Sequence, residues 1–134
     1  MNRINCLQVK RVVHCFSILF LLFVSGCAGL PDQKTGVFDR RRVEYSLIGN
    51  NGGAGVVVFE NGLNGKMAWW HKVIPEISKE ATTFAYNRPG YGSSDPVATP
   101  RDGLHIVDEL RLLLTSNGLK PPYVLVGHSR SVAY

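Results

Sequence analysis

The strongest constraint on the fold is an alternation of strand-like and helix-like segments between residues 43 and 126. Residues 56–59 form a continuous run of β-branched and aromatic side chains, which is typical of a strand covered on both faces. Similar patterns predict strands over 43–48, 82–86 and 123–126. Because helix-like segments separate most of these strands, we expect an α/β domain with a mostly parallel sheet and helices on both faces.

Two segments between the strands have helical spacing. Apolar residues recur over 70–77, where Pro75 is expected to kink or shorten the helix. Thr99 is predicted as the N-cap of a second helix, because a proline follows it and Asp102 supplies a capping acid. Gly118 is a suitable stop for this helix. Its predicted apolar face consists of Ile106, Val107, Leu110, Leu113 and Leu114.

The N-terminus has the plan of a secretory signal over residues 1–26. Basic residues precede an apolar stretch, and Val24-Ser25-Gly26-Cys27 resembles the bacterial lipoprotein box, in which the cysteine becomes lipid-modified. We therefore expect export to the bacterial cell envelope, a lipid anchor on Cys27 and a tether over 27–42. The alternative is a retained transmembrane helix over 12–30. Either arrangement leaves the remaining chain on a membrane surface outside the cytoplasm.

Charge and cysteine content exclude several classes of function. The net charge of +5 depends on three basic residues near the N-terminus, and without residues 1–26 there remain 12 basic against 10 acidic groups. Because the cluster Arg40-Arg41-Arg42 has no interleaved aromatic residues, we expect no nucleic-acid partner. The cysteines, Cys6, Cys15 and Cys27, all lie in the signal or at the lipid site, which excludes disulfides and cysteine-ligated metal in the domain.

A candidate nucleophile follows the last predicted strand. Gly127-His128-Ser129-Arg130-Ser131 has the strand context required of a nucleophile elbow. In such an elbow the serine has a positive φ, and its hydroxyl projects above the sheet. The helix that follows directs its N-terminal dipole at the serine, which favours developing negative charge.

Three segments together resemble the α/β-hydrolase fold family over residues 43–134. Asn61-Gly62-Leu63-Asn64-Gly65 resembles its oxyanion loop, Asn87-Arg88-Pro89-Gly90-Tyr91-Gly92-Ser93-Ser94-Asp95 its D-R-P-G-Y-G-x-S-D segment, and 127–131 its elbow. The resemblance implies that Ser129 is the nucleophile and that the backbone N–H groups of Leu63 and Arg130 form the oxyanion hole. It further implies that the segment containing Arg88, Gly90 and Gly92 shapes the rim. The expected substrate is a small molecule with a carboxylic ester or related acyl bond, and no cofactor or metal is implied.

The sequence also departs from the family pattern. Ser131 and Val132 stand where glycine is frequent and crowd the elbow, while Asn61 and Asn87 replace a frequent histidine and aspartate. An alternative function is therefore a catalytically dead lipoprotein with a binding role or with no activity.

The histidine and acid of a serine triad are not assigned within this chain. In the family they follow the serine, whereas His71, His105 and His128 precede Ser129 or adjoin it. His128 is expected to pack or to form a supporting hydrogen bond. The resemblance thus implies the N-terminal half of the fold, truncated just after the elbow. We expect this chain alone to be marginally folded, because its sheet would end on an uncovered edge, and nearly inactive.

Overall fold

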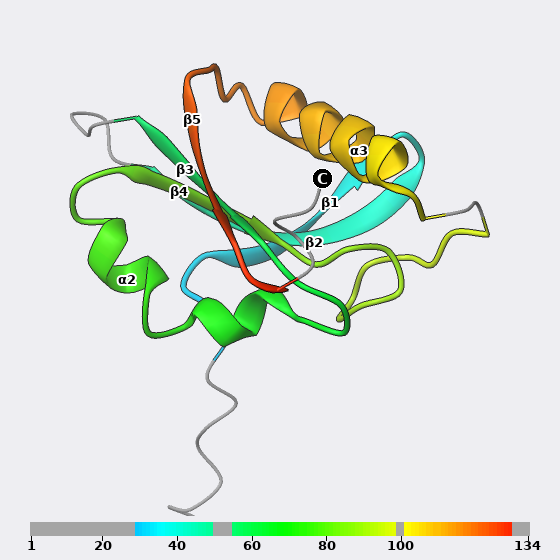
Figure 1. Ribbon diagram of the computed structural model, residues 1–134, viewed down its shortest axis with the longest axis horizontal. Coiled ribbons are helices and arrows are strands. Elements are labelled where there is room, and N and C mark those ends of the chain that lie inside the picture. Colours follow the sequence, from blue (N-terminus) through cyan, green and yellow to red (C-terminus); the bar gives the residue numbers. More distant parts are fainter. Residues whose placement is uncertain (1–28, 50–54, 99–100, 130–134) are drawn as a thin grey trace, which may run out of the picture.

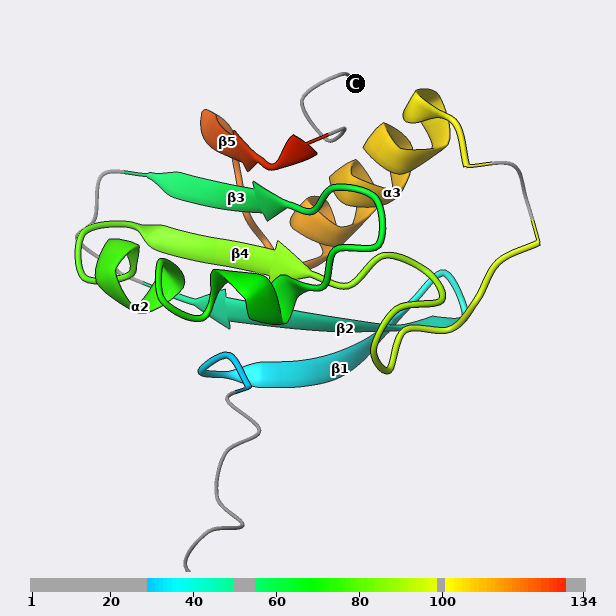
Figure 2. The ribbon, with the colours of Figure 1, turned by 60° about the horizontal axis from the view of Figure 1, so that its bottom comes forward.

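The sheet is the centre of the computed structural model, which describes residues 29–49, 55–98 and 101–129. Within these residues five strands pair in the order β1-β2-β4-β3-β5, which Figure 2 shows from the side. The strands are β1 (Gln33–Phe38), β2 (Arg41–Ile48), β3 (Val56–Glu60), β4 (Thr82–Tyr86) and β5 (Tyr123–Gly127). The helical elements are the 3-10 helix η1 (Met67–Trp70), α2 (Ile74–Ile77) and α3 (Gly103–Ser116).

Strand direction divides the sheet into two parts. β3 pairs in parallel with both β4 and β5, whereas β2 is antiparallel to β4 and to β1. The α/β class expected from the sequence is confirmed, with the three parallel strands at one side of a mixed sheet. The parallel strands end at the same edge, where loops from different parts of the chain meet.

β1 lies within residues 27–42, which the sequence predicts as a tether, so the expected domain boundary at residue 43 is wrong. Gln33–Phe38 instead pairs along its whole length with β2. Its side chains are mostly exposed, as is common for an edge strand, so the sequence lacks the apolar run that reveals buried strands. Leu30, just before β1, is buried in the core. The folded domain therefore includes Leu30.

Helices cover both faces of the sheet, as predicted (Figure 1). η1 and α2 lie on one face, where Met67 and Ile74 pack with Phe59 of β3. α3 lies on the opposite face, where Leu113 and Leu114 pack with Phe84 of β4. Phe59 and Phe84 are fully buried, and Leu113 and Leu114 are 3% exposed. The two cores together fix the sheet between its helical layers.

The helix boundaries follow local backbone chemistry. Pro75 lies in the first turn of α2, so the predicted 70–77 helix is split into η1 and α2, because proline has no N–H for a preceding helical turn. Thr99, the predicted N-cap, lies outside the described residues, and the N-cap of α3 is instead Asp102, whose carboxylate accepts a hydrogen bond from His105 N–H at 3.0 Å. Gly118, with φ of 71°, follows the end of α3 as expected.

β5 forms an open edge of the sheet within the described residues. Val124 and Leu125 are 59% and 65% exposed, whereas Val58 of the neighbouring β3 is fully buried. An uncovered edge of the sheet is what the sequence predicts.

The predicted signal and Cys27 lie outside the described residues. Among the helices of the described part of the chain, none has the length and apolar character needed to cross a membrane.

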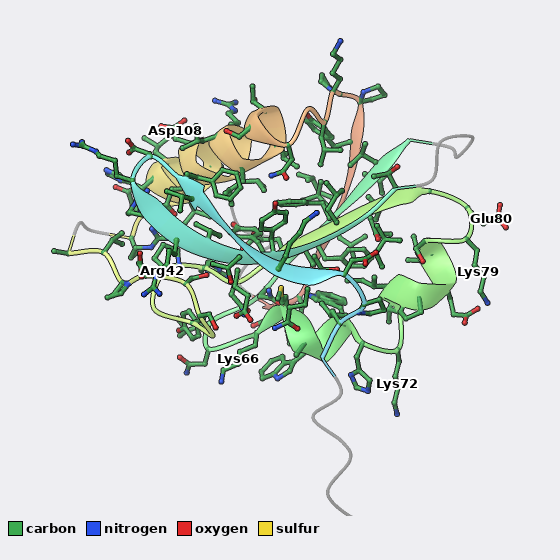
Figure 3. The ribbon with its side chains drawn as sticks, turned by 180° about the vertical axis from the view of Figure 1, so that it is seen from behind. Arg42, Lys66, Lys72, Lys79, Glu80 and Asp108 are labelled. Carbon is green, nitrogen blue, oxygen red and sulfur yellow. The ribbon has the colours of Figure 1, made fainter. Side chains whose placement is uncertain are left out.

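A buried carboxylate ties the segment after β4 to β2. Glu44 Oε2 accepts hydrogen bonds from Ser93 N–H at 2.8 Å and from the Asn87 side chain at 2.7 Å, and Gln33 donates to Oε1. Burial raises the pKa of Glu44, but these hydrogen bonds outweigh it and the pKa is lowered. Farther along, Arg42 extends from β2 to the Asp95 carboxylate at 2.8 Å (Figure 3). The segment is thus held at two points.

We predict that Glu44→Gln destabilises the folded full-length protein by about 1–3 kcal/mol at pH 7, because an amide cannot accept from all three donors. The lowered pKa means that the wild-type advantage is present above the ordinary value of 4.5 and is lost as the pH falls below it. Urea unfolding at pH 7 and pH 3.5 measures both effects. The exposed Glu80→Gln is the control, and an equal loss of stability in both variants would contradict the role of Glu44.

Candidate active site

Ser129 lies directly beyond the end of β5, and its backbone is in the left-handed region with φ of 61°. A residue other than glycine rarely adopts this conformation, which costs on the order of 1 kcal/mol and marks a sharply bent corner. The residue is exposed. These features match the elbow geometry that the sequence predicts. Arg130 and Ser131 lie outside the described residues.

The loop after β3 forms a tight turn. Gly65 N–H donates to the Gly62 carbonyl at 3.1 Å, and Asn64 has φ of 62°. Leu63 is 62% exposed. The loop therefore places Leu63 at the surface of the domain.

The loop and the elbow are in direct contact. Parallel pairing sets Glu60 of β3 beside Gly127 of β5, and His128 N–H donates to the Glu60 carbonyl at 3.3 Å. A Cβ atom placed on Gly62 would lie 2.6 Å from the His128 carbonyl oxygen and 2.9 Å from Ser129 Cβ. Only glycine leaves room for this approach. Figure 2 shows the same edge of the sheet, with the ends of β3 and β5 side by side.

The side chains of Asn61 and Asn87 hold the loop after β3 through hydrogen bonds. These bonds explain why asparagine replaces the family's frequent histidine and aspartate at these two positions. The Asn61 side chain accepts from Trp70 Nε1 at 2.8 Å and donates to the Tyr86 carbonyl at 3.2 Å. The Asn87 side chain accepts a hydrogen bond from Met67 N–H at 2.9 Å and donates one to the Glu44 carboxylate. Each amide needs both a donor and an acceptor, so a carboxylate at residue 87 would lose one partner.

A buried ion pair that the sequence analysis missed lies beside the loop. Arg88 Nε is 2.8 Å from Glu60 Oε1, an ion pair without the alignment of a hydrogen bond, and the side chains are 13% and 11% exposed. Tyr86 donates its hydroxyl to Glu60 Oε2 at 2.6 Å. Burial raises the pKa of Glu60, and the Tyr86 hydrogen bond and the Arg88 charge offset it only in part. The one sequence signal was an acid at the end of a buried strand.

The segment after β4 also reaches the loop directly. Arg88 Nη2 donates to the Gly62 carbonyl at 3.2 Å, and the Tyr91 hydroxyl donates to Asn64 Oδ1 at 3.1 Å. Gly90 and Gly92 have φ of 82° and 55°, so both use the backbone freedom expected of them. The segment thus contacts the loop after β3 at two points.

The histidines occupy distinct places. The ring of His128 lies edge-on to the ring of Trp69, with 6.2 Å between centroids, which fits its expected packing role. His71 contacts the Ala68 carbonyl at 3.1 Å, and His105 contacts the Asp102 carboxylate at 2.7 Å. The contacts of His71 and His105 are therefore within their own helical segments. Among the described residues, no group of three His, Cys, Asp or Glu side chains could hold a metal ion.

Solved structures with a similar fold include several hydrolases. A putative lipase from Acinetobacter baumannii superimposes with a TM-score of 0.67 and 22% identity, covering 77% of this chain and 34% of the lipase. The epoxide hydrolase CorEH superimposes with a TM-score of 0.64 and 22% identity, covering 72% of this chain and 33% of CorEH. At this identity the similarity shows the fold alone.

Sequence comparison identifies the family. An uncharacterized protein of Bacillus subtilis, YqjL, is 37% identical over 79 residues, which cover 58% of this chain and 31% of YqjL. The chain thus spans about a third of the length of these relatives. The sequence profile of the alpha/beta hydrolase fold matches residues 55–130, which include the loop after β3, the segment after β4 and Ser129. The chain belongs to the alpha/beta hydrolase fold family.

Proposed function

We propose that this chain carries the nucleophile and the oxyanion hole of a serine hydrolase that cleaves carboxylic esters or a related acyl bond. Ser129 Oγ attacks the substrate carbonyl, and the N–H groups of Leu63 and Arg130 bind the resulting oxyanion. The order of the triad in this family requires that the acid and the histidine base lie C-terminal to Ser129 in the complete protein. On this proposal, residues 1–134 alone are nearly inactive.

The proposal depends most on the contact between the elbow and the loop after β3. Ser129 is exposed and has the φ of an elbow, and Gly62 lies directly beside it. Such an arrangement brings a backbone N–H close to the atom that a nucleophile would attack, which is the requirement for oxyanion stabilisation. A hydroxyl at this position favours acyl transfer over the carboxylate chemistry of epoxide hydrolases.

We further propose that Cys27 is lipid-modified and anchors the domain in the bacterial cell envelope. Leu30 is already buried in the core, and only two residues separate it from Cys27 in the sequence. Three Cα steps span on the order of 10 Å. The anchor would therefore keep the domain close to the bilayer surface, without the longer tether that the sequence suggested.

We predict that a fluorophosphonate probe labels Ser129 of the full-length protein, because the probe reacts with an activated serine. Mass spectrometry of the labelled peptide identifies the residue, and Ser129→Ala, which removes the hydroxyl, abolishes the label. Ser116→Ala is the matched control, since Ser116 is an exposed serine at the end of α3. Folded full-length protein that takes up no label would support the catalytically dead alternative and contradict the proposal.

We predict that Gly62→Ala slows fluorophosphonate labelling at least about 10-fold, because the new methyl group forces the loop away from His128 and Ser129. Gly49→Ala is the control, since a Cβ there meets no atom within 4 Å. The second-order labelling rate measures the effect. Equal rates for Gly62→Ala and the wild type would show that the contact does not matter for reactivity.

We predict that the protein incorporates labelled palmitate in a bacterial host and sediments with membranes, and that Cys27→Ala loses the palmitate. Two acyl chains, each contributing about 0.8 kcal/mol per buried methylene, give stable anchoring. Cys15→Ala, within the predicted signal, is the control and keeps the label. Membrane sedimentation of Cys27→Ala without palmitate would instead support the transmembrane alternative.

A further inference from the structure

The Gly62 carbonyl receives two hydrogen bonds from different parts of the chain. Gly65 N–H, in the same loop, donates at 3.1 Å, and Arg88 Nη2, from the segment after β4, donates at 3.2 Å. Two donors determine the direction of a carbonyl more closely than one, since each restricts its rotation. Arg88 is the charged donor of the two, and a charged donor gives a stronger hydrogen bond than a neutral donor of the same geometry.

The direction of this carbonyl also sets the direction of the next N–H. Among the described residues only the Pro121–Pro122 bond is cis, so the peptide bond between Gly62 and Leu63 is trans. In a planar trans peptide the C=O and the N–H point to opposite sides. With the Gly62 oxygen turned toward Arg88, the Leu63 N–H is turned away from it. If this peptide rotated, its N–H would face the guanidinium, which is itself only a donor.

Arg88 is in turn held by buried groups. Its Nε lies 2.8 Å from the Glu60 carboxylate, and Tyr86 fixes that carboxylate from the other side with a hydrogen bond of 2.6 Å. Burial and the Glu60 charge raise the pKa of Tyr86 well above its ordinary value, so the hydroxyl stays protonated and remains a donor. The guanidinium is therefore fixed at one end by Glu60 and presents its other end to Gly62.

We propose that Arg88, held by Glu60, is a positioning residue that orients the Leu63 N–H for oxyanion binding. The inference rests on the proposed function, because it assigns a role within the same site. Arg88 polarises the peptide through its hydrogen bond to the Gly62 oxygen, which makes the Leu63 N–H a better donor. It acts through the peptide and does not itself contact the substrate.

The test is fluorophosphonate inactivation of the full-length protein, with the maximal rate kinact separated from the probe affinity KI. We expect Arg88→Met to lower kinact about 10- to 100-fold, somewhat less than the loss of an oxyanion donor, while KI changes less than about twofold. Arg88→Lys and Glu60→Gln, which keep most of the volume, should lower kinact by intermediate amounts. Arg111→Met, which breaks the exposed ion pair with Asp108 on α3, is the control and should react like the wild type.

The outcomes separate the inference from the proposed function. Wild-type protein without any label on Ser129 overturns both. Wild-type labelling with an unchanged kinact in Arg88→Lys and Arg88→Met overturns the inference alone. If Arg88→Met does not fold, the Lys variant decides, provided that its thermal melting matches the wild type. A parallel rise in KI with no fall in kinact would show that Arg88 affects only the general shape of the site.

Discussion

The close approach of the loop after β3 to the end of β5 is the constraint on which the candidate site depends. Parallel pairing of β3 with β5 fixes it, because Glu60 and Gly127 are opposite each other in the register. The backbone segments that follow these two residues therefore lie close together. Because Gly62 has no side chain, Ser129 can occupy the space beside it. A one-residue change in register would separate the two segments, so the pairing of β3 with β5 determines the geometry of the site.

Two buried carboxylates beneath this contact are held by ion pairing and hydrogen bonds. Glu60 lies at the end of β3 and Glu44 within β2, and both residues are less than 10% exposed. Burying a charge is costly unless donors surround it, and the segment after β4 supplies these donors to both carboxylates, with Arg88 at one and Asn87 and Ser93 at the other. The segment is thereby bound to both β2 and the loop. The positive φ angles of Gly90 and Gly92 allow this packing, and both glycines lie in the segment that contacts the loop after β3.

The sequence predicted the parallel part of the fold well, because buried strands are recognised by continuous apolar runs. β4 begins and ends where expected, and β3 and β5 differ by a single residue. β1 was missed because its residues alternate without a buried face. The N-cap of α3 was misplaced because Thr99 and Asp102, three residues apart, are both suitable capping residues. For the site, the positions of Gly62 and Ser129 followed from motifs. The role of Glu60 could not be predicted from the sequence, because its ion pair depends on which loops the sheet brings together.

The central claim is that Ser129 and the Leu63 N–H act on the same atom. A crystal structure of the full-length protein after reaction with a fluorophosphonate tests this most directly, because the phosphonyl oxygen occupies the position of the oxyanion. The account predicts an adduct on Ser129 Oγ, with the phosphonyl oxygen about 2.7–3.1 Å from Leu63 N. An adduct whose oxygen points away from the loop after β3, with Leu63 N bonded elsewhere, would contradict it.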